Sequence, residues 1–159
     1  MPEELSQFRN RELLIDSNLL LLRVVGKFDY HLIGRKRLEA FTVQDFQVLN
    51  VLISFAKQLI TTPGILTETS NLAAQIVDER RRKRLFEDFG ATIRQSLDEG
   101  HEKSAVVCEQ PAFLSFGLTD AVIAHVARAG MLVLTVDLPL YGYLLRNGVD
   151  AENFNHFRA

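Results

Sequence analysis

The stretch RELLIDSNLLLLRVVGKF, residues 11–28, decides how this chain folds. Its first part, which ends at Ile15, has the continuous apolar character of a strand that is buried on both faces. The second part most simply continues as a helix from Ser17 to Phe28. Asp16 stands between the two, where burial of its charge costs free energy unless a partner compensates it. Asp16 therefore requires either a structural partner or a functional one.

The composition indicates one globular domain that spans residues 1–159, with 47% hydrophobic and 24% charged residues. The net charge of −2 does not indicate a nucleic-acid-binding protein, so any such binding must rest on a local patch. The single cysteine, Cys108, excludes an internal disulfide and suits a reducing compartment, and we expect its thiol to be buried. The apolar run from Leu13 to Val25 is too short to span a bilayer. We expect a cytoplasmic protein without membrane contact.

Strand-like and helix-like stretches alternate along the chain, which predicts an α/β fold with a mostly parallel sheet. Thr42 and Asp45 have the spacing of a capping box, and the apolar line of the helix after them runs through Leu49 and Ile53 to Ile60. LITTPG, residues 59–64, ends this helix, and a short strand there stays open. MLVLTVD, residues 131–137, reads as a central strand.

The other elements are expected from weaker patterns. Thr119 is a plausible N-cap of a helix that Gly130 ends. Residues 96–104 read as a loop, residues 105–109 as an extended segment, and residues 153–157 as an edge strand.

Four acidic residues share one property: each lies at a strand end or on the inward face of a helix. They are Asp16, Glu68, Asp120 and Asp137. The strand-end acids should meet at the carboxyl edge of the sheet, where open α/β folds bind ligands. Such a cluster is unstable alone, because each carboxylate raises the pKa of the others. Mg²⁺ or Mn²⁺ would resolve the conflict and could activate a water for phosphodiester hydrolysis.

Four segments, in this order, resemble the successive motifs of the PIN domain family of metal-dependent nucleases. They are LLIDSNLLL, TTPGILTETSNL, FGLTDAVIAHVARAG and MLVLTVDLPLYGYL, and they extend from about residue 11 to the C-terminus. The resemblance implies a three-layer α/β/α fold, Mg²⁺ or Mn²⁺ at the acidic cluster, and cleavage of single-stranded RNA by a metal-activated water. It assigns the acidic positions to Asp16, Glu68, Asp120 and Asp137, a supporting hydroxyl to Thr135 and a supporting polar group to Asn18.

Two features depart from many members of that family. TVDLPLYG has no second acid directly after Asp137, which weakens the case for a second firmly held metal. The stretch from Gly26 to Gln58 is longer than in the compact toxins of toxin–antitoxin pairs, and this puts the toxin interpretation in doubt. An antitoxin-like protein partner and a homodimer both stay open.

Structural interpretations compete with these functional ones. Any one of the acids taken alone fits a cap or a salt bridge better than a metal ligand, and a PIN-fold module that only binds RNA or protein is the alternative to a nuclease. Arg81 and Arg84, in the basic run of residues 80–84, could clamp RNA phosphates, although an ion-paired, solvated helix face fits the flanking acids better. The basic run of residues 35–37 is open to the same two interpretations, phosphate contacts or a solvated surface. The four histidines are too scattered for a zinc site.

Overall fold

The structure, a computed structural model that describes residues 3–159, contains a sheet of five parallel strands. The strands lie in the order β3-β2-β1-β4-β5, and every neighbouring pair is parallel. Their bounds are β1 (Glu12–Ile15), β2 (Gln58–Thr61), β3 (Leu97–Glu99), β4 (Met131–Thr135) and β5 (Ala151–Asn153). The expected α/β fold with a parallel sheet is confirmed.

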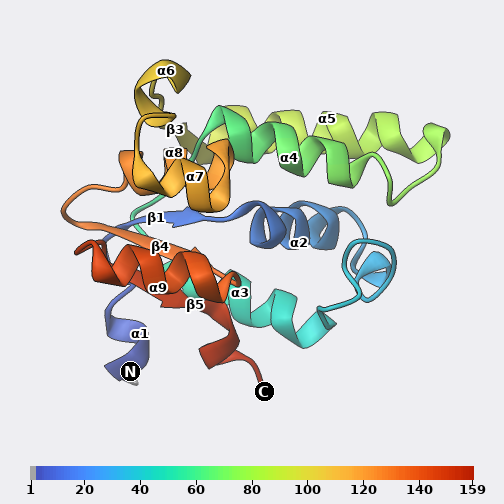
Figure 1. The fold of residues 1–159 in the computed structure, drawn as a ribbon. Helices are drawn as coiled ribbons and strands as arrows, with labels where there is room; N and C mark the ends of the chain where they lie inside the picture. Colours follow the sequence, from blue (N-terminus) through green and yellow to red (C-terminus); the bar gives the residue numbers. More distant parts are fainter. Residues whose placement is uncertain (1–2) are drawn as a thin grey trace.

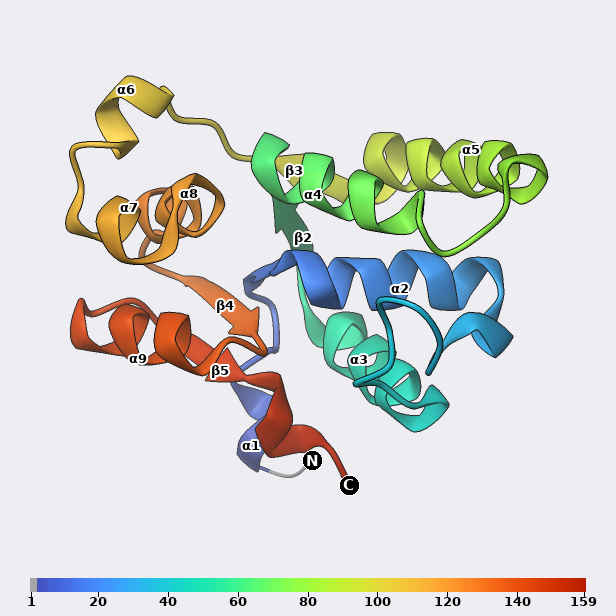
Figure 2. The ribbon, with the colours of Figure 1, turned by 45° about the vertical axis from the view of Figure 1, so that its right-hand side comes forward.

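Helices cover both faces of this sheet (Figure 1). In Figure 2, α2, α3 and α5 lie on one side of the strands, whereas α7, α8 and α9 lie on the other. The helices are α1 (Glu3–Ser6), α2 (Ser17–Phe28), α3 (Val43–Phe55), α4 (Pro63–Ala73), α5 (Glu79–Ser96), α6 (Ser104–Val107), α7 (Pro111–Phe116), α8 (Leu118–Val126) and α9 (Leu138–Arg146), with short 3₁₀ helices η1 (Tyr30–Leu32) and η2 (Phe154–Phe157). Together the layers form an α/β/α sandwich.

The chain leaves the two central strands towards opposite faces of the sheet. β1 leads into α2, and its neighbour β4 leads into α9 on the other side. In open α/β sheets such a reversal leaves a crevice at the carboxyl ends of the two strands. Ile15 is paired with Leu134, so β1 and β4 end side by side. The residues that follow them therefore lie side by side at this edge of the sheet.

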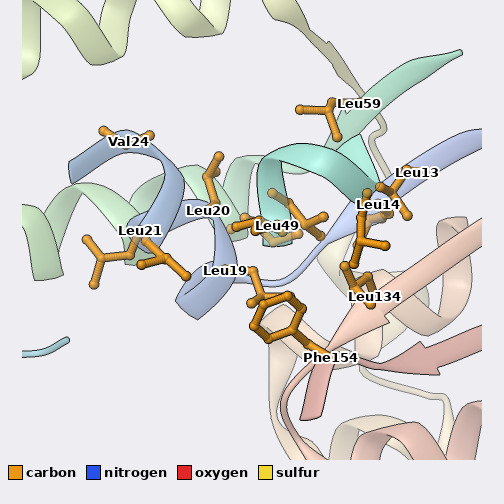
Figure 3. Close-up of a cluster of buried hydrophobic side chains, with 14 of the residues drawn as sticks. Leu13, Leu14, Leu19, Leu20, Leu21, Val24, Leu49, Leu59, Leu134 and Phe154 are labelled. Atoms are coloured by element: carbon orange, nitrogen blue, oxygen red, sulfur yellow. The ribbon is translucent and has the colours of Figure 1, made fainter. Parts of the chain in front are cut away.

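The core forms because the central strands and α2 are apolar on almost every side. Leu13, Leu14 and Ile15 are at most 1% exposed, and all five residues of β4 are buried. Leu19, Leu20, Leu21 and Leu22 are buried as well, since α2 contacts α3, α4 and α5. Figure 3 shows side chains from α2, α3 and the strands meeting in this core. A helix that is apolar all round is typical of such a buried position.

Polar caps set where the helices begin. The expected capping box of α3 is confirmed, because the Thr42 hydroxyl accepts from the Asp45 backbone and the Asp45 carboxylate accepts from the Thr42 backbone. α4 begins after Thr62, whose hydroxyl accepts from Ile65 N–H at 3.2 Å. Such caps satisfy N–H groups that have no partner inside the helix.

Several expected boundaries are wrong. The helix expected to run through Ile60 ends at Phe55, and Ile60 is instead a buried residue of β2. Apolar residues continue at the spacing of a helix beyond Phe55, so the periodicity of the sequence did not reveal where the helix ends. Residues 97–99 of the expected loop form the edge strand β3, which pairs with β2. Its polar sequence carries little strand propensity, and the pairing with β2 decides its conformation.

The remaining corrections fall in the last third of the chain. The expected extended segment contains the short helix α6, and Cys108 at its end is exposed rather than buried. α8 begins after Gly117 and not with Thr119 as its N-cap, and it ends at Val126, before Gly130. The last strand covers residues 151–153, and residues 154–157 form η2. No helix in residues 3–159 has the length and apolar character needed to cross a bilayer.

Candidate acidic site

Asp16 lies at the carboxyl end of β1 and is held there by three hydrogen bonds. Its Oδ1 accepts from Leu19 N–H at 3.0 Å and so caps α2. Its Oδ2 accepts from the Thr135 hydroxyl at 2.6 Å and from Val136 N–H at 2.9 Å. Asp16 is only 6% exposed. The buried charge therefore has a structural compensation, and its carboxylate is fixed in one orientation.

Thr135 joins the ends of the two central strands. Its fully buried hydroxyl donates to Asp16 and accepts from Asp137 N–H at 3.0 Å. The Asp137 side chain is exposed, and its Oδ1 accepts from Leu140 N–H at 2.9 Å, which caps α9. The expected supporting hydroxyl thus contacts two of the four acidic residues. Asp16 and Asp137 both cap the helix that follows their strand.

Asp120 enters the same region from the first turn of α8. It is partly buried, and no hydrogen bond from its carboxylate is observed within residues 3–159. The starts of α4 and α8 lie close together, because a Cβ built on Gly64 would be 3.6 Å from the Thr119 Cα. This approach brings α4, which carries Glu68, beside Asp120.

Glu68 does not lie on the inward face of its helix, contrary to expectation. The buried residues of α4 are Ile65, Thr69 and Ala73, and Glu68 is exposed. The expectation used Leu72 as a buried position, but Leu72 is only partly buried, so the true buried face is displaced by one residue along the helix. Glu68 is therefore a solvent-exposed residue of α4 and not a member of its buried face.

The charges of the other three acids affect the pKa of Asp120. Burial raises the pKa of Asp120 to about 6, and the negative charges of three other carboxylates add to the rise, those of Asp137, Asp16 and Glu68. Burial also raises the pKa of Asp16, and Asp137 contributes to the increase, whereas the hydrogen bonds to Asp16 oppose it. Asp16 and Asp137 are brought together by the Thr135 hydroxyl. A common site of all four acids stays a prediction.

The donor set suits a hard divalent cation, although the observed side-chain positions do not form a complete cage. Carboxylate oxygens are the ligands that Mg²⁺ and Mn²⁺ prefer. Within the described part of the chain, no group of three or more His, Cys, Asp or Glu side chains is placed so that it could hold a metal ion. Asp16 is fixed by its hydrogen bonds, whereas Glu68 and Asp137 are exposed. Coordination by three of the acids therefore requires side-chain positions other than those observed.

The other residues predicted for the site lie apart from this cluster or have structural partners. Asn18 is exposed in the first turn of α2. Arg81 Nη2 donates to Asp29 Oδ2 at 2.7 Å, and its guanidinium lies 5.1 Å from the centre of the Phe28 ring. This hydrogen bond is the main reason why the pKa of Asp29 falls to about 2. Arg84 is exposed on α5. RNA contacts by Arg81 and Arg84 stay a prediction.

One member of the site was missed in the sequence. Val136 contributes its backbone N–H to Asp16, and no side-chain pattern indicates such a donor, since every residue except proline carries one. Only its place directly after a strand-end threonine could have suggested it.

Comparison of the chain with models of protein families and with curated proteins finds no match.

Proposed function

We propose that this protein is a metal-dependent endoribonuclease that hydrolyses phosphodiester bonds in single-stranded RNA. One observation supports the proposal: Asp16 and Asp137 meet through the Thr135 hydroxyl at the carboxyl edge of the sheet, and burial together with the charges of Asp137, Asp16 and Glu68 raises the pKa of Asp120 to about 6. A fold gains no stability from such repulsion, so a cationic ligand is its simplest explanation. The sequence resemblance to PIN domains supports the choice of RNA as the substrate.

The acidic residues would have the following roles in metal binding. Asp16, held by Leu19, Thr135 and Val136, would offer a carboxylate of fixed orientation at the carboxyl end of β1. Asp120, Asp137 and Glu68 would supply the other carboxylates that hold Mg²⁺ or Mn²⁺. Such an ion, when bound, lowers the pKa of a water molecule and neutralises charge that develops on a phosphoryl group.

Thr135 would act as a positioning residue in this scheme. Its hydroxyl fixes the spacing between Asp16 and the backbone of Asp137, so that both remain at the crevice. A cation would also favour the ionised form of Asp120, and metal binding should therefore release protons near pH 6.

A cytoplasmic location belongs to the same proposal. The single cysteine, Cys108, carries an exposed thiol, which suits a reducing compartment that also contains RNA.

The test is an incubation of the protein with single-stranded RNA in Mn²⁺ and in chelator. Attack by a water molecule should give products with a 5′-phosphate, in Mn²⁺ only, and Asp120→Asn should remove most of the cleavage. Products with a 2′,3′-cyclic phosphate would contradict the mechanism, because they arise when the 2′-hydroxyl of the RNA attacks. Binding of RNA without cleavage in either condition would favour the alternative, a binding module of the same fold.

A further inference from the structure

Two basic runs that lie 45 residues apart in the sequence meet at one surface pocket. Its walls include Lys36, Arg37, Glu39, Gln75, Val77 and Arg82. The first three come from the segment between η1 and α3, and Arg82 comes from the first turns of α5. Three cationic side chains thus face one carboxylate, that of Glu39. We call these residues the basic pocket.

The cations of the basic pocket are not used by the fold as ion-pair partners. Within residues 3–159, no carboxylate lies within 4.0 Å of the charged nitrogens of Lys36, Arg37 or Arg82. Arg82 Nε is also shielded from solvent and has no hydrogen-bond partner there. Arg81, one residue earlier, is paired with Asp29 at 2.7 Å. The two neighbouring arginines therefore differ, since only Arg81 is held by an acidic residue.

Arg37 is held in place from outside its own segment. Its Nε and Nη2 both donate to Gln75 Oε1, at 2.8 and 2.5 Å. Its backbone has a φ of +67°, a conformation that residues other than glycine adopt at a free-energy cost. A guanidinium has five N–H donors, so three remain for a ligand. Arg37 is thus already oriented, and binding would lose less side-chain entropy than at a flexible arginine.

The basic pocket is remote from the acidic cluster. Asp16 caps the start of α2, and the segment that forms the pocket follows the end of the same helix. The 12 residues of α2 span roughly 18 Å at about 1.5 Å per residue. The cations therefore do not reach a phosphate that is bound beside Asp16.

We propose that the basic pocket binds a phosphate group. Two arginines and a lysine around one concave surface match the charge and the several acceptor oxygens of a phosphate. The phosphate could belong to an RNA chain or be free inorganic phosphate. The idea that bound RNA continues from the pocket to the acidic cluster rests on the proposed nuclease function, whereas phosphate binding by the pocket does not.

The experiment measures binding of two probes in chelator, so that cleavage plays no part. The probes are a fluorescently labelled single-stranded RNA and inorganic phosphate. The test variant is Lys36→Ala/Arg82→Gln, and its matched control is Lys83→Ala, which removes an exposed lysine of α5 outside the basic pocket. A third variant, Glu39→Gln, removes the single negative charge of the pocket and should strengthen binding. Thermal melting checks that each variant is folded.

For RNA, we expect the double variant to weaken binding and to reduce the slope of log K against log salt by about 1.4, since each single-strand phosphate contact contributes about 0.7. Lys83→Ala should change the slope by less than half of this. Weakened binding of RNA alone would identify a nucleic-acid phosphate, and weakened binding of inorganic phosphate alone would identify a free-phosphate site. The proposal is overturned if the double variant matches Lys83→Ala with both probes, or if Glu39→Gln weakens binding. Loss of nuclease activity in separate assays would leave this result unaffected.

Discussion

At the scale of single residues, the acidic cluster contains two kinds of carboxylate. Asp16 is buried and fully engaged by hydrogen bonds, so its carboxyl oxygens connect β1 with α2 and β4, although burial of its charge outweighs these bonds and raises its pKa. Asp120 is partly buried, and its carboxylate makes no observed hydrogen bond within the described residues. Substitutions at the two positions should therefore affect the free energy of unfolding in opposite directions. Replacing Asp16 with Asn should destabilise with or without metal, because Val136 N–H would face an amide or lose its partner.

Asp120→Asn should stabilise the metal-free protein near pH 7. The pKa of Asp120 is about 6 when folded, and an ordinary aspartate in the unfolded chain has about 3.8, so the folded state binds the proton more tightly. Asp120 therefore reduces the free energy of unfolding as the pH rises from about 4 to about 6, by about 1–2 kcal/mol after allowance for its partial exposure. Asn cannot titrate, and the variant should lack this loss. Urea unfolding in chelator at pH 4.5 and pH 7 measures it, and an identical pH dependence of the wild type and the variant would contradict the assigned pKa.

Thr135→Val should cost more stability than Thr135→Ser, although valine has nearly the shape of threonine. Valine leaves a buried Asp16 oxygen without one of its two donors and Asp137 N–H without its acceptor, a loss of about 1–3 kcal/mol. Serine keeps both hydrogen bonds and loses only a methyl group, worth about 0.8 kcal/mol. Urea denaturation of both variants makes the comparison. A valine variant as stable as the serine variant would show that the hydroxyl does not connect the two strands.

At the scale of elements, close packing in the core is most demanding where α2 crosses α3. A Cβ built on Gly26 would lie 2.5 and 2.6 Å from two ring carbons of Phe46. This contact explains a glycine inside a helix, where glycine is otherwise about 1 kcal/mol less favourable than alanine. Gly90 in α5 is the opposite case, since its Cβ would be 3.4 Å from the flexible end of Arg94.

Gly26→Ala and Gly90→Ala should therefore change stability with opposite signs. The first should destabilise by about 1–3 kcal/mol through overpacking, which exceeds the gain in helix propensity. The second should stabilise by roughly 0.5–1 kcal/mol. Midpoints of urea unfolding give both values. In a Phe46→Leu background, the cost of Gly26→Ala should fall, and a cost that stays the same would show that the ring is not the obstacle.

The sequences of the individual elements explain which of them could be predicted. β1, β4 and α2 were found because their sequences are strongly apolar, and the capping box of α3 was found because Thr42 and Asp45 carry it in their side chains. β3 and α6 were missed, since their short sequences have no clear period and their conformation depends on what they pack against. The end of α3 was missed because the apolar steps continued into β2.

At the scale of the whole molecule, the proximity of Asp16 and Asp137 was predictable because topology determines where strand ends meet. Asp16 and Asp137 follow adjacent parallel strands, a relation that an alternating pattern already suggests. The placement of Glu68 on the inward face of α4 was wrong, because the buried face lies one position further along the helix. The sequence of α4 alone does not show which elements pack against it. The basic pocket could not be predicted, since it joins two runs that only the folded chain brings together.

Acidic and basic residues also cluster near opposite ends of α2. The acidic cluster lies at the start of this helix and the basic pocket beyond its end. An RNA bound at both would meet cations far from the reacting phosphate, which leaves the acidic crevice to a metal ion. We therefore propose that the four carboxylates bind a divalent cation.

A titration of the protein with Mn²⁺, followed by calorimetry, tests that claim most directly, because it needs no knowledge of the substrate. The wild type should bind Mn²⁺ with release of protons near pH 6, as the carboxyl of Asp120 ionises. Asp120→Asn should bind at least tenfold more weakly and release fewer protons, while Lys83→Ala should match the wild type. A wild type that binds no Mn²⁺, or an Asp120→Asn variant that binds it equally well, would contradict the claim.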